Sequence, residues 1–245
     1  SGELTAGAAR RQRCRPAGTW AQSGARWSRH GRPGDRRRAA DHPKDQLKAK
    51  ALQAAPDHPW VKSNPEWFKW RPDGTVQYAE NPPKKYQDIL PIYFESEDWK
   101  GLWDEMLACC MYWVEEFGIR IFRVDNPHTK PFYFWGWLMA EVKKKYPDVL
   151  FLSEAFTRPS VMHQLAKQGF TQSYTYFTWR NSKHELIEYM NDLTQTDQKE
   201  YMRPNFWPNT PDINPYHLQG ANESKYLQRY ALAATLSSNI GIYGP

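Results

Sequence analysis

Short β-branched runs alternate with amphipathic segments along residues 98–245, and this alternation limits the folds that are open to the chain. The strand-like runs end, 22 to 36 residues apart, near Asp125, Glu154, Tyr176, Asp212 and Tyr243. Apolar residues at helical spacing mark segments over 99–117, 132–146, 161–167, 181–193 and 223–236. Buried strands that alternate with helices in this way predict parallel βα units, which suit an open doubly wound sheet or a (β/α)8 barrel.

The first of these helical segments carries its own end signals. Asp98 precedes it and can cap its first turn, and Gly118 follows it as a glycine at a helix C-terminus does. Cys109 and Cys110 lie on its apolar stripe, so we expect both to serve helix packing.

The position of the acidic residues separates the two folds. Asp125 and Glu154 each close an apolar strand-like run, and Asp212 follows a third. Barrel enzymes carry their chemistry at the carboxyl ends of their strands. No G-x-G-x-x-G or G-x-x-x-x-G-K-[ST] sequence follows a strand, so a dinucleotide or P-loop site has no support. The sequence therefore favours a (β/α)8 TIM barrel.

The same acids suggest a chemistry. Arg123 lies two residues before Asp125 on one strand, so both side chains share a face, where the cation keeps the carboxylate ionised and oriented. Glu154 follows an apolar run, and partial desolvation raises a carboxyl pKa toward the range of a general acid. Such a pair suits glycosyl transfer with retention, with the two carboxyl groups about 5–5.5 Å apart. A helix cap or a turn is the alternative role for each acid.

Several motifs resemble those of the α-amylase superfamily, glycoside hydrolase family 13. Its successive signature regions are matched by Arg123-Val-Asp125-Asn-Pro-His128, Glu154-Ala-Phe156 and Asn209-Thr-Pro-Asp212. Longer stretches resemble the maltosyltransferase branch of that superfamily and cover residues 56–61, 79–88, 122–131, 152–159, 169–180 and 201–205. The resemblance spans about residues 51–245. It implies a glycosyltransferase that moves maltosyl units from α-maltose 1-phosphate to the non-reducing end of an α-1,4-glucan.

The resemblance also implies a role for each matching residue. Asp125 corresponds to the nucleophile that forms a covalent β-glycosyl intermediate, and Glu154 corresponds to the general acid/base. Asp212 matches the third acid, which stabilises the transition state, and Arg123 matches the arginine that orients the nucleophile.

The residues that match the donor-phosphate site are Gln53, Lys84, Tyr86 and Asn126, and His128 is a candidate for substrate contact. A lysine supplies positive charge for a phosphate, and amides and a phenol supply neutral donors. The alternatives are a solvated loop for Lys84, a core position for Tyr86 and a structural role for His128. We expect no cofactor and no metal site.

The first fifty residues differ from the rest of the chain in charge and in amino-acid composition. They hold 13 Lys and Arg against 4 Asp and Glu, and the first Val of the chain is Val61. Such a segment buries too little apolar surface to offset its ordering entropy. We expect residues 1–50 to be a basic segment that is disordered or encoded in the wrong reading frame. A basic arm for nucleic acid is the alternative.

The match to the family covers only part of a barrel. We expect residues 51–245 to supply about the third to the eighth strand, with 56–97 as a loop-rich insertion after the third. The family's third strand carries an Asp where this chain has Ala49. An incomplete barrel leaves apolar faces and sheet edges uncovered, so we expect the isolated chain to be poorly folded and inactive. The other functional hypotheses are an α-amylase-like hydrolase and a non-catalytic barrel fragment.

Composition narrows the location and the partners. The chain has no apolar run of about 18 residues and no N-terminal secretory pattern, which predicts no membrane association. Cys14, Cys109 and Cys110 include no C-x-x-C pair, which argues against a disulfide framework and a thiolate zinc site. We expect a cytoplasmic protein whose partners are maltose 1-phosphate and an α-1,4-glucan acceptor rather than nucleic acid. A homodimer is one option for the parent protein.

Overall fold

The structure, a computed structural model, describes residues 47–50 and 52–243, with only the backbone of residues 47–50. The described residues form two compact units, the first comprising 52–118 and the second comprising 47–50 and 119–243. Most of the segment 1–50, which we expect to be disordered, lies outside the described residues. The last four residues of that segment are described, and they form strand β1 (Leu47–Lys50).

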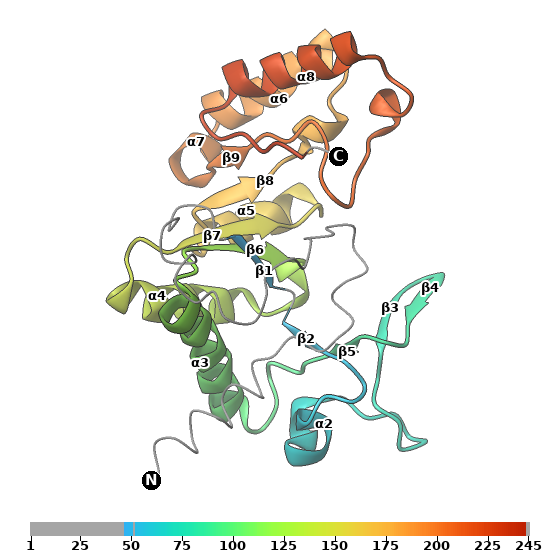
Figure 1. The fold of residues 1–245 in the computed structure, drawn as a ribbon, viewed down its shortest axis with the longest axis vertical. Coiled ribbons are helices and arrows are strands. Elements are labelled where there is room, and N and C mark those ends of the chain that lie inside the picture. Colours follow the sequence, from blue (N-terminus) through green and yellow to red (C-terminus); the bar gives the residue numbers. More distant parts are fainter. Residues whose placement is uncertain (1–46, 51, 244–245) are drawn as a thin grey trace, which may run out of the picture. The chain divides into compact units, whose positions relative to one another are not determined.

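The second unit is built on one parallel sheet (Figure 1). Its strands follow the order β1-β6-β7-β8-β9, and every neighbouring pair is parallel. The four strands after β1 are β6 (Ile121–Asp125), β7 (Leu150–Glu154), β8 (Gln172–Tyr174) and β9 (Pro204–Asn205). The predicted α/β class with a parallel sheet is confirmed.

The connections between β6 and β9 and the segment after β9 carry the helices of this unit. These are α4 (Phe132–Lys145), α5 (Pro159–Lys167), α6 (Lys183–Gln195), α7 (Gln198–Tyr201) and α8 (Glu223–Leu236). Short 3-10 turns lie at η2 (Pro127–Thr129), η3 (Tyr176–Trp179) and η4 (Tyr216–Leu218). Helix α6 begins two residues later than the expected 181–193 segment, because Ser182 is its cap: the Ser182 hydroxyl accepts from the Glu185 backbone N–H and the Glu185 carboxylate accepts from the Ser182 backbone N–H.

Two predicted strands are shorter than their sequence patterns suggest. The run over 202–207 contributes only β9 and a bridge from Phe206 to Ile240, and the run over 239–243 contributes only that bridge. Pro204 and Pro208 have no backbone N–H and cannot donate to a ladder, which limits the first of these runs. Asp212 therefore lies in a loop seven residues beyond β9, rather than at a strand end.

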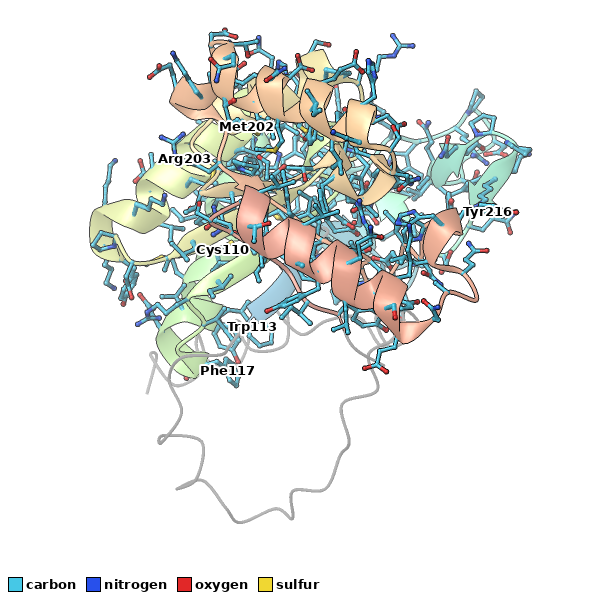
Figure 2. All side chains as sticks on the ribbon, turned by 90° about the horizontal axis from the view of Figure 1, so that it is seen from above. Cys110, Trp113, Phe117, Met202, Arg203 and Tyr216 are labelled. Atoms are coloured by element: carbon cyan, nitrogen blue, oxygen red, sulfur yellow. The ribbon has the colours of Figure 1, made fainter. Side chains whose placement is uncertain are left out.

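An apolar cluster joins α5, α6 and α8 to the sheet. Its buried members are Met162, Ala166, Phe177, Leu186, Tyr189, Leu193, Met202, Phe206 and Ala233. Phe177 and Phe206 stack with their ring centroids 4.5 Å apart. Met202, labelled in Figure 2, fills this cluster, whereas Tyr216 in the same view is 89% exposed. The cluster fixes the segments that carry β8 and β9.

The first unit is built from short elements and one long helix. The elements before that helix are β2 (Gln53–Ala54), α2 (Trp60–Ser63), η1 (Pro65–Trp67), β3 (Ala79–Asn81), β4 (Lys84–Tyr86) and β5 (Leu90–Pro91). Strand β2 pairs with β5 and β3 pairs with β4, both antiparallel.

The long helix is α3 (Trp99–Phe117), which has the predicted bounds. The Asp98 carboxylate accepts a hydrogen bond from the Gly101 backbone N–H at 3.2 Å and one from the Trp67 indole at 3.1 Å. Gly118 ends the helix in the left-handed region at φ 64°. Both cysteines of α3 are buried, so their predicted packing role is confirmed.

Candidate active site

Two neighbouring strands end in the two candidate catalytic carboxylates. Strand β6 ends at Asp125 and β7 ends at Glu154, and the register of the parallel pair places these two residues opposite each other. Along β6 the buried residues alternate with Arg123 and Asp125, so these two side chains share the other face. The strand pattern therefore delivers three charged side chains to one edge of the sheet.

Arg123 holds the acids together. Its guanidinium lies against the Glu154 carboxyl group, and its Nη2 lies 3.0 Å from Oδ2 of Asp212. Its Nη1 lies 4.0 Å from Oδ1 of Asp125. The structure thus brings together all four residues that the sequence predicts as catalytic. Arg123 contacts Glu154 and Asp212 more closely than the adjacent Asp125, although the resemblance gives it the task of orienting Asp125.

Burial sets the protonation of Glu154. The residue is 5% exposed, and this loss of solvent raises the pKa of its carboxyl group to about 8. The positive charge of Arg123 opposes the rise, and a hydrogen bond with Asp125 adds to it. The same surroundings raise the pKa of Arg123: burial, the largest single effect, lowers it, but the acidic groups of Glu154, Tyr174, Asp125 and Asp212 together outweigh burial. Near neutral pH Glu154 therefore carries a proton that it can donate, as a general acid must.

Asp212 is positioned by the loop that follows β9. The buried Thr210 hydroxyl accepts hydrogen bonds from the backbone N–H groups of Asp212 at 3.3 Å and Ile213 at 3.1 Å. This turn positions the Asp212 carboxylate next to Arg123, although Asp212 lies seven residues beyond the end of β9. The Asp212 side chain is 43% exposed, whereas that of Arg123 is 13% exposed, so the third acid lies at the solvent side of the cluster.

Tyr174 belongs to this cluster, although no sequence motif assigns it a catalytic role. It is the last residue of β8 and is buried, and the Arg123 guanidinium lies 6.0 Å from its ring centroid. Burial raises the pKa of its phenol to about 12, although Arg123 opposes the rise. Its place at a strand end, on the edge that carries Asp125 and Glu154, is the signal that could have identified it.

The turn after Asp125 carries the remaining candidates of this unit. Asn126 is exposed and adopts the left-handed conformation at φ 47°, and its backbone N–H donates to the Glu154 carbonyl at 3.1 Å. His128 is half-buried, and its Nδ1 is enclosed and has no hydrogen-bond partner among the described residues. Burial lowers the pKa of this imidazole, and the nearby charge of Lys130 lowers it further. Both residues lie within three positions of Asp125, where a substrate group could reach them.

The other three candidates lie in the first unit. Gln53 in β2 is half-buried and pairs with Pro91 of β5. Lys84 and Tyr86 begin and end β4, and Lys84 is exposed whereas Tyr86 is half-buried. These three residues belong to a different compact unit from Asp125. Their part in a phosphate site therefore stays a prediction.

Among the described residues, no group of three or more His, Cys, Asp or Glu side chains is placed to hold a metal ion. No helix in this part of the chain is long and apolar enough to cross a lipid bilayer.

Curated relatives of the chain share one name. It is 63% identical over 195 residues to the "Alpha-1,4-glucan:maltose-1-phosphate maltosyltransferase" of Chlorobaculum tepidum and 58% identical over 209 residues to that of Methylacidiphilum infernorum. The matches cover 80% and 85% of this chain. The chain is homologous to these maltosyltransferases. It spans only 29% and 31% of their lengths, and no family model matches it.

Solved structures with a similar fold are α-amylases. A maltogenic α-amylase from Thermotoga neapolitana superposes with a TM-score of 0.63 at 20% sequence identity and covers 80% of this chain. An α-amylase from Lactobacillus plantarum superposes with a TM-score of 0.61 at 17% identity and covers 79%. The chain spans 45% and 49% of these two structures. The similarity shows that the chain shares the α-amylase fold over that part.

Proposed function

We propose that this chain belongs to a retaining glycosyltransferase that moves maltosyl units from α-maltose 1-phosphate to the non-reducing end of α-1,4-glucans. The observation that carries the proposal is the 63% identity over 195 residues to a protein named for this reaction. The chain also carries the cluster in which Arg123 contacts Glu154 and Asp212 beside Asp125. Synthesis of glycogen or a similar glucan in the cytoplasm would be its physiological role.

The strand order supports a (β/α)8 barrel. Five parallel strands follow one another around the sheet in sequence order, and the bridge from Phe206 to Ile240 extends the series by one position. Sequential parallel neighbours are typical of a barrel, whereas doubly wound sheets reverse their order. We assign β1 to the third barrel strand and the segment around Ile240 to the eighth. Residues 56–97 are then an insertion after the third strand, and residues 1–50 are a separate basic segment apart from β1.

The first half-reaction uses the two strand-end acids. Asp125 attacks the anomeric carbon of the donor and forms a covalent β-maltosyl ester, while Glu154 gives its proton to the departing phosphate oxygen. Adjacent strands lie about 4.8 Å apart, and the two acids occupy paired positions. This spacing supports the short carboxyl separation of about 5–5.5 Å that retention requires.

In the second half-reaction Glu154 acts as a base. It removes the proton from the 4-hydroxyl group of the acceptor, which attacks the maltosyl ester and restores the α-configuration. Asp212, held by Arg123 at 3.0 Å, would bind sugar hydroxyls and stabilise the positive charge of the transition state. Asn126 adjoins the nucleophile and would hold the leaving phosphate, together with Gln53, Lys84 and Tyr86 and with His128 nearby.

Phosphate release tests the proposal. In the maltosyltransferase of Chlorobaculum tepidum, the 195 matched residues would be replaced by those of this chain. The chimera would then be incubated with α-maltose 1-phosphate and glycogen. We expect stoichiometric release of phosphate and growth of the glucan chains, and neither from the Asp125→Asn chimera.

Two outcomes would reject the proposal. Free maltose as the main product would identify an α-amylase-like hydrolase, which has no need of a phosphate site. A folded chimera that binds glycogen but releases no phosphate would identify a non-catalytic barrel. The unmodified relative, assayed in parallel, shows that the acceptor and donor are competent. Sedimentation of the chimera and of the relative would test the homodimer.

A further inference from the structure

A tyrosine hydroxyl ties the loop after Glu154 to a neighbouring turn. Residues 155–158 connect Glu154, the last residue of β7, to Pro159 at the start of α5. Within this loop the Thr157 carbonyl accepts a hydrogen bond from the hydroxyl of Tyr176, the first residue of η3. Neither the sequence motifs nor the named relatives assign a function to Tyr176. The bond joins the loops that follow two neighbouring strands, β7 and β8.

The turn η3 is itself anchored to two helices. Arg229 of α8 is 1% exposed, and its guanidinium donates to the carbonyls of Phe177 at 2.6 Å and Arg180 at 2.8 Å. The same guanidinium lies 4.1 Å from the ring centroid of Phe177. From α6, the hydroxyl of the buried Tyr189 accepts from the Tyr176 backbone N–H at 3.3 Å. The turn is therefore a fixed point to which the loop after Glu154 is attached.

The loop passes its position to Glu154 over a short length of backbone. Two residues separate Thr157 from Glu154, and the Thr157 backbone N–H donates to the Ala155 carbonyl at 3.0 Å. On the other side the Glu154 backbone is held at the end of β6, since its carbonyl accepts from the Asn126 N–H at 3.1 Å. Glu154 thus lies between a strand that fixes it and a loop that is tied through Tyr176.

The position of Glu154 matters because a proton donor has to meet a defined oxygen atom. Its carboxyl group is buried against Arg123, and a general acid must lie within hydrogen-bond reach of the leaving oxygen. A displacement of about 1 Å can cost about 100-fold in rate. A shift of the loop after β7 would move Glu154 relative to Asp125, which lies opposite it on β6.

We propose that Tyr176 is a positioning residue whose hydroxyl holds the loop after β7 and keeps Glu154 buried and in register with the candidate nucleophile. The tie between the two loops follows from the structure, and its consequence for catalysis rests on the proposed function. Tyr176→Phe removes the hydroxyl and keeps the ring, whose centroid lies 6.1 Å from that of Tyr189. The Thr157 carbonyl then loses this donor, which loosens the loop.

The first test observes Glu154 without any turnover. In the full chain with 13C-labelled glutamate, the Glu154 carboxyl signal, assigned with Glu154→Gln, is followed by NMR as a function of pH. Burial is the largest cause of its raised pKa, about 8, so a loosened loop that admits water lowers the midpoint of the titration. We therefore expect a lower midpoint in Tyr176→Phe. The charged groups that act on this carboxyl group are unchanged in the variant: Arg123, Asp125 and Asp212.

Tyr226→Phe is the matched control for this titration. The Tyr226 hydroxyl also donates to a backbone carbonyl, that of Leu218 at 3.1 Å, but this bond ties α8 to η4. Its removal should leave the midpoint of Glu154 unchanged. A midpoint that does not fall in Tyr176→Phe, or that falls equally in Tyr226→Phe, would overturn the proposal.

The second test asks whether the loss falls on acid catalysis. In the chimera described above, kcat/KM is compared for α-maltose 1-phosphate and α-maltosyl fluoride, with and without Tyr176→Phe. Fluoride is a weakly basic leaving group, so its departure depends less on a general acid than that of phosphate. We expect the variant to lose at least about fivefold more with the phosphate donor, because a small displacement of the acid is costly where a proton must be given.

Equal losses with both donors would mean that Tyr176 only supports the fold, and this would overturn the proposal. If the unsubstituted chimera used neither donor, the proposed function would fail. The NMR titration would still decide whether Tyr176 positions Glu154. The two failures are therefore distinguishable.

Discussion

Replacing Glu154 by Gln should stabilise the chain in a way that depends on pH. Gln keeps the shape of the protonated acid but cannot ionise. The folded-state pKa of Glu154, about 8, lies above its ordinary value of 4.5. For such an acid, stability is fully present below pH 4.5 and is lost as the pH rises to about 8, because the unfolded chain ionises first.

The size of the effect follows from the pKa difference. One pKa unit corresponds to about 1.4 kcal/mol. Ionisation of Glu154 therefore costs about 2 kcal/mol of stability at pH 6 and about 5 kcal/mol at pH 9. The advantage of Glu154→Gln over the wild type should thus grow by about 3 kcal/mol between these two pH values.

Urea unfolding monitored by tryptophan fluorescence measures this difference at pH 6 and pH 9. Groups that do not interact with Glu154 titrate alike in both proteins and cancel in the comparison. Glu141→Gln, a half-buried position on α4 outside the cluster, is the control variant and should show no such growth with pH. An advantage of Glu154→Gln that is the same at both pH values would refute the burial argument.

Three further outcomes follow from the same structure. Maltosyl transfer should decline above about pH 8 as Glu154 loses its proton, and a pH–rate profile that is flat to pH 10 would contradict its role as the acid. Arg123→Met should reduce phosphate release at least about 100-fold, because this side chain aligns Glu154 and Asp212; a loss below tenfold would show that the acids are positioned without it. Gly118→Ala should lower the free energy of unfolding by about 1 kcal/mol, since the residue ends α3 at φ 64°; urea unfolding with no loss would show that the cap relaxes.

The sequence predicts local structure well where one helix or strand carries its own signals. Helix α3 has the bounds that its apolar spacing, Asp98 and Gly118 predict. Strands β6 and β7 end at the acids that the alternation placed there. These features depend on residues that are close together in the sequence, so the sequence alone is enough to predict them.

Features that depend on long-range contacts were harder to predict. Asp212 reaches Arg123 from a loop rather than from a strand end, and the turn around Thr210 that allows this has no periodic pattern. Tyr174 could not be placed beside the acids from the sequence, because burial beside a charge appears only after the strands pair. The contacts that Arg123 makes with two distant acids are also results of the fold.

The left-handed turn at Asn126 has a consequence for how this site can change. A φ of 47° suits Asn or Gly and disfavours other side chains, and the same residue is the candidate phosphate ligand next to the nucleophile. Most substitutions that would remove the amide would also disturb the turn and, with it, the strand end that presents Asp125. Substitution of Asn126 alone is therefore an unfavourable route by which the protein could evolve to use a donor with a different leaving group. The backbone of Lys84, another predicted phosphate ligand, belongs to an ordinary hairpin and the residue is exposed, so substitution there should disturb the fold less.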